Sequence, residues 1–439
     1  MRKNLFRLAV LTALAVPFIG SAQDGQKTDR EFYGRPSYWR PYDQRGINVF
    51  ETGKQDSLPF EGPRLRIGAG FTQQFQSLKH ETKAVGKTLY RMGSNFNLAQ
   101  ANLFIDAQLA DGIRLHVASY MSARHHEETW VKGGYIQFDK LPFKGQFWSD
   151  LMKLTTIKVG HMELNYGDAH FRRTDGGQSL YNPFIENYIV DAFTTEVGGE
   201  VTLQKNGVFG LFGVTNGVLN PSVTAQAPDV EKDSSRNPSV YAKVGIDKNL
   251  GEKLRVRVTG SAYVNKKAQG AALYGGDRTG SNYWGVMELV GYDPVASFTS
   301  GRFNPGFKRR IQAYQFSGFV KYGGFELFGN IETAKGSAAT AADPKDRTMN
   351  QSAIDALYRI GAKENLFVGV RYNKVNSEMA GNPNKVKIDR TAFAAGWFLT
   401  KSVLLKGEIV KQQYKNFLPT DVKYGGKFHG YVIEAVVGF

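Results

Sequence analysis

The chain has 439 residues with a formal net charge of +16, no cysteine, 49 glycines and 13% aromatic residues. Without cysteine it forms neither disulfides nor thiolate nucleophiles, and without a run of about 18 apolar residues after position 22 it has no helical membrane span. The glycine and aromatic content fits a transmembrane β-barrel better than a helical protein, because only alternate residues of a barrel strand meet lipid.

Residues 1–22 are typical of a secretory signal peptide. Arg2 and Lys3 give a positive start, Leu8–Ile19 is an apolar stretch too short to span a membrane, and small residues precede an expected cleavage site after Ala22. An exported chain that is rich in tyrosine and glycine rarely meets nucleic acid. The positive charge therefore indicates small polar or anionic solutes, or an anionic lipopolysaccharide surface, as partners.

Residues 23–62 show no regular periodicity, and glycine, proline, tyrosine and charged residues dominate them. We expect this part to be a periplasmic or lumenal N-terminal segment. No Pro-rich linker divides the rest of the chain, so residues 63–439 are predicted to form one all-β, antiparallel transmembrane β-barrel.

From Pro63 onward, apolar and polar residues alternate in short runs, which is typical of strands with one face toward lipid. Short turns such as Asp111-Gly112 alternate with longer loops between these runs. The predicted strands are Arg64–Gln76, Asn95–Ala110, Ile113–Arg124, Thr129–Lys140, Leu154–Glu163, Thr194–Gln204, Gly207–Thr215, Ser239–Lys248, Lys253–Asn265, Ile311–Lys321, Phe325–Thr333, Ser352–Ile360, Leu366–Lys374, Ile388–Phe398, Ser402–Tyr414 and Phe428–Phe439.

The orientation of turns and loops tests this count, because short turns of bacterial barrels face the periplasm and long loops face outside. Counting Ser281–Tyr292 as a further strand would place the tight Tyr322–Gly324 turn outside. We therefore predict 16 strands, with Ser281–Tyr292 as a hairpin or inward fold within a long extracellular loop, 266–309. Eighteen strands remain an alternative if Ile47–Glu51 joins the sheet. A short helix is expected around Trp148–Lys153.

The stretch between Glu163 and Thr194 is the best candidate for a constriction loop. It is the third long loop in the predicted order, and a barrel of about 16 strands is too wide for wall side chains alone to fill. We expect it to fold into the lumen; the alternative is a solvated outside loop. Its candidate constriction residues are Tyr166, Asp168, Arg172, Arg173, Asp175, Glu186 and Asp191.

Basic side chains on several strands share the face opposite the apolar residues, as Arg64 and Arg66 do beside Leu65. A charge on the lipid face costs about 2–4 kcal/mol near the bilayer midplane, so these side chains are expected to point into the lumen. They form a predicted basic wall of Arg64, Arg66, Arg114, Lys158, Arg255, Arg257 and Arg371. We expect a mild anion preference, although the acidic residues Glu196, Glu200 and Glu408 can also face inward.

The last strand carries an apolar stripe that ends on an aromatic residue. Tyr431, Ile433, Ala435, Val437 and Phe439 fall on one face, because strand side chains alternate. This stripe resembles the C-terminal insertion strand of bacterial outer-membrane β-barrels. We expect it to face lipid while the strand pairs with the first strand and closes the barrel in the outer membrane of a Gram-negative bacterium.

The segment from Tyr38 to Glu51, which reads YWRPYDQRGINVFE, resembles the N-terminus of porin-like outer-membrane proteins of the Bacteroidota group. The overall plan is similar to that of the phosphate-selective porin O/P family: a signal peptide, a basic first strand, 16 strands and a terminal Phe. These resemblances imply a homotrimeric, general or anion-selective channel.

These features predict a porin for passive diffusion of small hydrophilic solutes or ions. The first alternative is a non-conducting barrel that holds other surface proteins, with its lumen plugged, for example by residues 23–62. The second is a barrel hydrolase, which would need a cluster of Ser, His and an acid.

Enzymatic and metal-binding signals are poor. No spacing links Ser119 to His116 or His161, and no phosphate-binding, dinucleotide or zinc-protease motif occurs. His125–Glu128 could suggest a metal site, but adjacent side chains of an extended chain point apart. We expect no enzyme activity and no catalytic, cofactor-binding or metal-binding residue.

Overall fold

The computed structural model describes residues 39–54, 60–97, 99–122, 129–218, 236–268, 270–275, 284–293, 297 and 301–439. The expected signal peptide (1–22), residues 23–38 of the N-terminal segment and the His125–Glu128 motif lie outside these ranges. None of the helices within them combines the length and the apolar character that a transmembrane helix needs.

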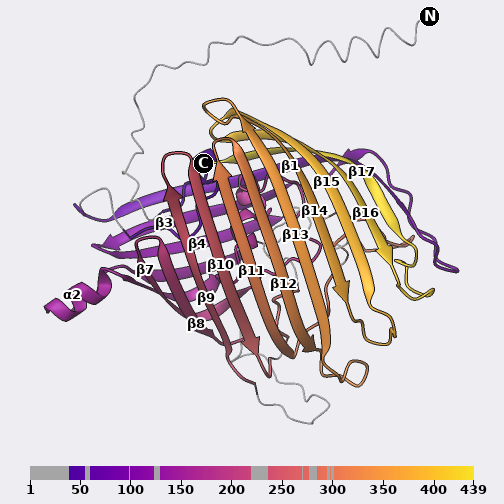
Figure 1. The fold of residues 1–439 in the computed structure, drawn as a ribbon, viewed down its shortest axis with the longest axis horizontal. Coiled ribbons are helices and arrows are strands. Elements are labelled where there is room, and N and C mark those ends of the chain that lie inside the picture. Colours follow the sequence, from indigo (N-terminus) through magenta and orange to yellow (C-terminus); the bar gives the residue numbers. More distant parts are fainter. Residues whose placement is uncertain are drawn as a thin grey trace, which may run out of the picture. The chain divides into compact units, whose positions relative to one another are not determined.

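The described residues form 17 strands in a single antiparallel sheet, drawn in Figure 1. They are β1 (Arg64–Glu81), β2 (Asn95–Phe96), β3 (Gln100–Ala110), β4 (Ile113–Ser122), β5 (Thr129–Phe138), β6 (Thr155–Glu163), β7 (Thr195–Lys205), β8 (Val208–Thr215), β9 (Ser239–Leu250), β10 (Leu254–Asn265), β11 (Arg310–Tyr322), β12 (Phe325–Ser337), β13 (Arg347–Ile360), β14 (Leu366–Ser377), β15 (Val386–Thr400), β16 (Val403–Lys415) and β17 (Lys427–Gly438).

Each long strand pairs with the long strands before and after it along the chain, and β17 pairs with β1 from Gly70–Gly438 to Glu81–Lys427, which closes the barrel. The short β2 and the longer β3 both pair with β1, so they are two pieces of one predicted strand. The closed barrel of 16 long strands is therefore confirmed. Ile47–Glu51 stays outside the sheet, so the 18-strand alternative is wrong.

Several strands extend beyond their predicted ends on the side of the long loops. β1 continues past Gln76 to Glu81, and β13 begins at Arg347 rather than Ser352. The alternation of apolar and polar residues stops where a strand leaves the apolar band, but backbone hydrogen bonds to the neighbouring strands continue. A short helix, α2 (Gln146–Met152), occupies the predicted helical link between β5 and β6.

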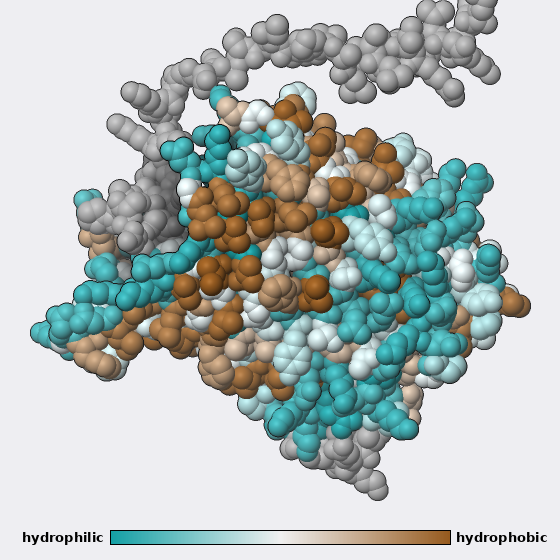
Figure 2. Space-filling model, in the orientation of Figure 1, coloured by the Kyte–Doolittle hydropathy of each residue, from teal (hydrophilic) through white to brown (hydrophobic). Residues whose placement is uncertain are grey.

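The two faces of the wall differ sharply, as β17 illustrates. Tyr431 and Ile433 are each 44% exposed on the outside, whereas the alternate residues Val432, Glu434 and Val436 are fully buried. Apolar side chains on the outer face form a broad hydrophobic area over the strands, brown in Figure 2. The alternation predicted for the C-terminal strand, with one apolar face outward, corresponds to this arrangement.

Candidate functional site

Residues 39–54, the part of the N-terminal segment next to the first strand, lie inside the barrel. The ring of Tyr42 stacks on Phe104 of β3, with centroids 4.5 Å apart, and its hydroxyl donates to Asp106 at 2.8 Å. On the opposite wall, the Asn48 amide donates to Glu326 of β12 at 2.7 Å. The segment therefore reaches across the barrel interior.

The loop between β6 and β7, residues 164–194, also occupies the lumen, as predicted, so the solvated outside loop is ruled out. Its short 3₁₀ helices are η2 (Ala169–Arg172) and η3 (Gly176–Leu180). Inward side chains of the wall accept hydrogen bonds from its backbone: Ile185 N donates to Glu408 at 2.7 Å, and Ile189 N donates to Asn373 at 2.6 Å. The loop thus satisfies its backbone donors on the barrel wall.

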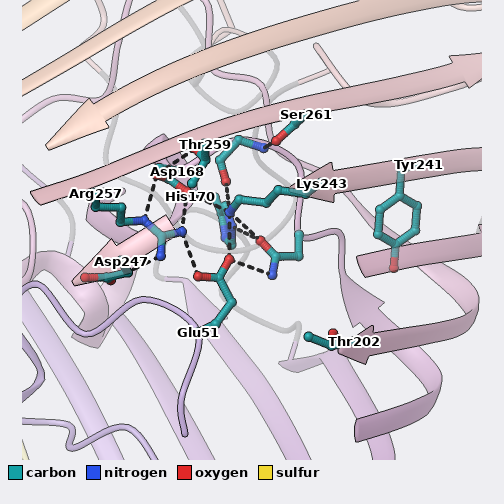
Figure 3. A network of polar contacts seen from close by, with 12 residues as sticks. Glu51, Asp168, His170, Thr202, Tyr241, Lys243, Asp247, Arg257, Thr259 and Ser261 are labelled. Atoms are coloured by element: carbon teal, nitrogen blue, oxygen red, sulfur yellow. Dashed lines mark hydrogen bonds and ion pairs between the residues drawn. The ribbon is translucent and has the colours of Figure 1, made fainter. Parts of the chain in front are cut away.

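A buried ionic network ties the loop, the N-terminal segment and the wall together, as Figure 3 shows. Asp168 of the loop lies 2.8 Å from the Arg257 guanidinium of β10 and 2.6 Å from the Lys243 ammonium of β9. Glu51 of the N-terminal segment contacts the same two cations, at 2.8 Å from Lys243 and 2.6 Å from Arg257. Thr259 donates a further hydrogen bond to Asp168 at 2.9 Å.

The charges of this network fix the protonation of its acids. Burial alone would raise the pKa of both carboxyls, but Lys243 and Arg257 outweigh burial. They hold the pKa of Asp168 well below its usual value and also lower the pKa of Glu51. Both acids are therefore ionised at neutral pH. The two acids and the two cations neutralise one another through charge-assisted contacts, so the network adds little net charge to the lumen.

Arg173 and Asp175 of the loop form a second cluster. Arg173 pairs with Asp191 of the same loop at 2.9 Å and lies 3.4 Å from Asp175. Asp175 also forms a short ion pair with Lys132 of β5 and accepts a hydrogen bond from Asn102 of β3. The loop is therefore bound to the β3–β5 side of the wall as well as to β9 and β10.

The third cluster lies on the β12–β14 side. Arg371 of β14 pairs with Asp355 of β13 at 2.7 Å and donates to the backbone oxygen of Glu186 at 2.8 Å. Arg172 lies 3.8 Å from Glu326 of β12. Tyr166, also a predicted constriction residue, donates instead to Glu332 of β12 at 3.1 Å. All seven predicted constriction residues are buried inside the barrel.

The predicted basic wall faces inward but is largely paired with acids. Arg66 lies 2.6 Å from Asp106, Arg255 lies 2.7 Å from Asp247, and Arg114 and Lys158 are each 3.6 Å from a carboxylate, Asp139 and Glu200 respectively. Arg64 is half-buried at the start of β1. Because Arg257 and Arg371 also have acidic partners, the wall carries little uncompensated positive charge.

Apolar side chains fill the interior beside β11–β17. Phe184 and Ile189 of the constriction loop and Phe307 of the 266–309 loop pack with inward wall residues such as Ile388 and Val432, each at most 2% exposed. Of the segment Ser281–Tyr292 the structure describes residues from Trp284 onward; these form no strand, and Trp284 and Val286 lie in this core. The segment was expected to form a hairpin or to fold inward, and these two side chains point into the packed interior.

A cavity of about 250 Å³ lies on the other side of the interior, against β1 and β3–β7. Its Lys and Arg side chains are Arg40, Arg66, Arg114, Lys132 and Lys158, and its Asp and Glu side chains are Glu51, Asp106, Glu163 and Glu200. His116, His161 and Tyr135 add further polar groups. Within the described ranges, no group of three or more His, Asp or Glu is placed to hold a metal ion.

The sequence did not single out several residues of this site. Lys243, Glu326 and Lys406 are buried in the lumen and bind the loop or the N-terminal segment. Strand alternation places them on the inward face, as it does Arg257, so parity could have found them. No local signal points to Glu51 or Asn48, because the side chains that bind them, such as Asn165, Lys243 and Glu326, are more than 110 residues away along the chain.

No protein-family model and no curated sequence matches the chain. Solved structures do. The anion-selective porin from Comamonas acidovorans is 11% identical, with a TM-score of 0.52 over 86% of this chain and 100% of the other. This chain therefore shares the fold of that porin, a closed antiparallel β-barrel. OmpT, an outer membrane protein of Vibrio cholerae (11% identity, TM-score 0.49, 86% and 100% coverage), and OprB of Pseudomonas putida (10%, 0.48, 86% and 94%) are also similar.

Proposed function

We propose that the protein is an outer-membrane porin that admits small hydrophilic solutes or ions through the cavity beside β3–β7. The observation that carries this proposal is the asymmetry of the lumen: one side is packed with apolar side chains, and the other keeps a cavity of about 250 Å³ lined by charged groups. A polar path through a closed barrel is what passive diffusion of polar solutes requires.

The proposal includes a mild anion preference. The cavity is lined by five Lys and Arg residues against four Asp and Glu residues, and such a lining favours anions only weakly. It also includes a secretory signal at residues 1–22, a location in the outer membrane and a homotrimeric assembly, as the resemblance to Bacteroidota porins implies.

Conductance across a planar lipid bilayer tests the proposal. Ala118 lines the cavity and is 4% exposed, whereas Ala395 faces outward on β15. Ala118→Trp is expected to reduce single-channel conductance by at least about half, since it fills part of the path, and Ala395→Trp is expected to leave it unchanged. No conductance by the wild-type protein would remove the porin proposal, and a reversal potential favouring potassium over chloride would remove the anion preference.

A non-conducting barrel that anchors other surface proteins is the second candidate. The extent of the filling favours it: the constriction loop, buried residues of the 266–309 loop such as Trp284 and Phe307, and residues 39–54 all occupy the interior. This candidate predicts an insulating barrel and a surface protein that co-purifies through the long loops.

A further inference from the structure

A group of lysines lies on the outside of the barrel at the loop ends of β14–β16. Lys374, Lys387, Lys411 and Lys415 surround a shallow groove of about 560 Å³, together with Tyr372, Asp389, Thr391 and Gln413. All eight side chains stand on the outward face of their strands. Cross-strand pairs place Lys387 opposite Lys415, Lys411 opposite Thr391, and Lys374 opposite Asp389. Figure 2 shows a hydrophilic area, teal, at this lower right end of the barrel.

The groove carries excess positive charge. Lys415 pairs with Asp389 at 3.1 Å, and Asp389 also accepts a hydrogen bond from the Tyr372 hydroxyl at 3.1 Å. Within the described part of the chain, Lys374, Lys387 and Lys411 have no acidic partner within 4 Å. Four lysines against one aspartate leave a charge of about +3, which attracts an anion.

The position of the groove relative to the apolar band indicates what kind of anion fits. Phe393 lies two residues beyond Thr391 on β15, and Ile409 lies two residues before Lys411 on β16, which is a distance of about 7 Å along each strand. Both side chains face outward and are 59% and 64% exposed. This end of the strands is joined by the longer links 378–385 and 416–426, whereas the opposite end has the short turns 361–365 and 401–402. Long loops face outside, so the groove lies at the level of the outer-leaflet headgroups.

Outward lysines at the loop ends gather on the side of the barrel that runs from β12 through β14–β17 to β1, with Lys335, Lys427 and Lys79 outside the groove. At the loop ends of β8–β10 the outward residues are Val214, Val240 and Val264, which pair with one another across the strands. A general requirement for solubility at the rim would not produce this contrast. The basic rim is therefore a feature of one side of the barrel, and the groove on β14–β16 is where four of its lysines meet.

We propose that this groove binds the phosphorylated headgroup of an outer-leaflet lipid. The phosphate lies among Lys374, Lys387 and Lys411, the Thr391 hydroxyl and Gln413 amide add neutral hydrogen bonds, and the acyl chains lie along Phe393 and Ile409. A phosphorylated lipid pairs its phosphate with the lysines and also covers the adjoining apolar surface with its acyl chains. Free phosphate would pair with the lysines only. The proposal does not depend on whether the lumen conducts.

The experiment measures binding of bisphosphorylated lipid A to the full-length protein in phosphatidylcholine nanodiscs by native mass spectrometry. The test variant combines Lys374→Gln, Lys387→Gln and Lys411→Gln. The control combines Lys205→Gln, Lys248→Gln and Lys253→Gln, three exposed lysines at the short-turn end with the same change in charge. Heat-modifiable migration on gels checks that each barrel is closed.

Affinity is expected to fall about 100-fold in the test variant, since each lysine near an anionic surface contributes about a fivefold factor. The control is expected to stay within about twofold, and lipid A without its phosphates is expected to bind the wild type as weakly as lipid A binds the test variant. If the triple variant does not fold, Lys411→Gln alone is expected to lose about fivefold.

Three results would overturn the proposal. The first is equal lipid A binding by the wild type and the test variant. The second is full competition by millimolar inorganic phosphate, which would make the site one for free phosphate. The third is a wild-type dimer in solution that the test variant loses, which would assign the groove to a second copy of the chain.

Discussion

Glu51 and Lys243 lie 2.8 Å apart, although one belongs to the segment ahead of the first strand and the other to β9. The pair joins the N-terminal segment to the wall at the same cations that hold the constriction loop through Asp168. Loop and segment therefore depend on one another for their positions in the lumen.

Glu51→Gln is expected to loosen the N-terminal segment without opening the barrel wall. Replacing a charged hydrogen-bond partner weakens docking by about 1–3 kcal/mol, which raises the undocked fraction about 5- to 150-fold. Limited proteolysis within residues 39–54 and longer high-conductance openings measure this change. Glu61→Gln, at an exposed residue just before β1, is the control. Equal proteolysis of both variants would contradict the role given to Glu51.

Asp168→Asn is expected to destabilise the folded barrel more than any surface change of the same kind. It leaves Lys243 and Arg257 with one acid fewer in a buried site, and breaking a buried ion pair in this way costs about 3–5 kcal/mol. Urea unfolding in detergent micelles measures the loss. Asp150→Asn, in the exposed helix α2, should change the unfolding free energy by less than about 0.5 kcal/mol.

Acidification is expected to destabilise the protein through the same network. The pKa values of Asp168 and Glu51 are lower in the folded state than their usual values near 4, so the unfolded chain binds more protons as the pH falls. The stabilisation is complete above about pH 5 and is lost progressively below about pH 4. Thermal unfolding from pH 6 to pH 3 should show a smaller decrease for Asp168→Asn than for the wild type. Parallel curves would rule out this contribution.

Gly438→Ala is expected to disturb the contact between the closing strand and the lumenal segments. A methyl group at Gly438 would overlap the backbone oxygen of Tyr42 and the side chain of Leu180, so both must move, at a cost of about 1–3 kcal/mol. At Gly407 of β16 the nearest atom is the Val432 backbone oxygen, at 3.8 Å. Gly407→Ala should therefore be neutral in the same unfolding experiment, and a similar loss in both variants would contradict the steric explanation.

Strand alternation predicted most of the fold because the two faces of each strand lie in different surroundings, lipid outside and the lumen inside. Arg257 and Leu254 could be assigned to opposite faces from parity alone, and the alternation of short and long links fixed the number of strands. The position of Ile47–Glu51 inside the barrel could not be predicted, since the contacts that hold it come from β9, β10 and β12, far away in the sequence.

The sequence indicates the filling of the lumen less clearly than it indicates the strands. Ile388, Ala392, Val410, Val432 and Val436 are apolar residues on the inward face, where a water-filled channel would favour polar ones. Residues 392–398 of β15 and 431–437 of β17 thus carry apolar side chains on both faces, interrupted on the inward face by Gly396 and Glu434. That pattern identifies the part of the wall that packs against folded loops, but only once the strand faces are known.

The contacts of Glu434 couple the last step of barrel closure to the folding of the interior. Glu434 of β17 accepts a hydrogen bond from Gln74 of β1, 360 positions earlier in the chain, and pairs with Lys406 of β16 at 2.9 Å. The Lys406 ammonium also donates to three backbone oxygens of the constriction loop, those of Ser179, Asn182 and Phe184. The closing pair of strands, β1 and β17, therefore gains all of these contacts only after the constriction loop has folded against the wall. Contacts between residues so far apart in the sequence form late and slowly. The chain should insert into the bilayer as one cooperative unit, with closure at β1 and β17 as its slowest event.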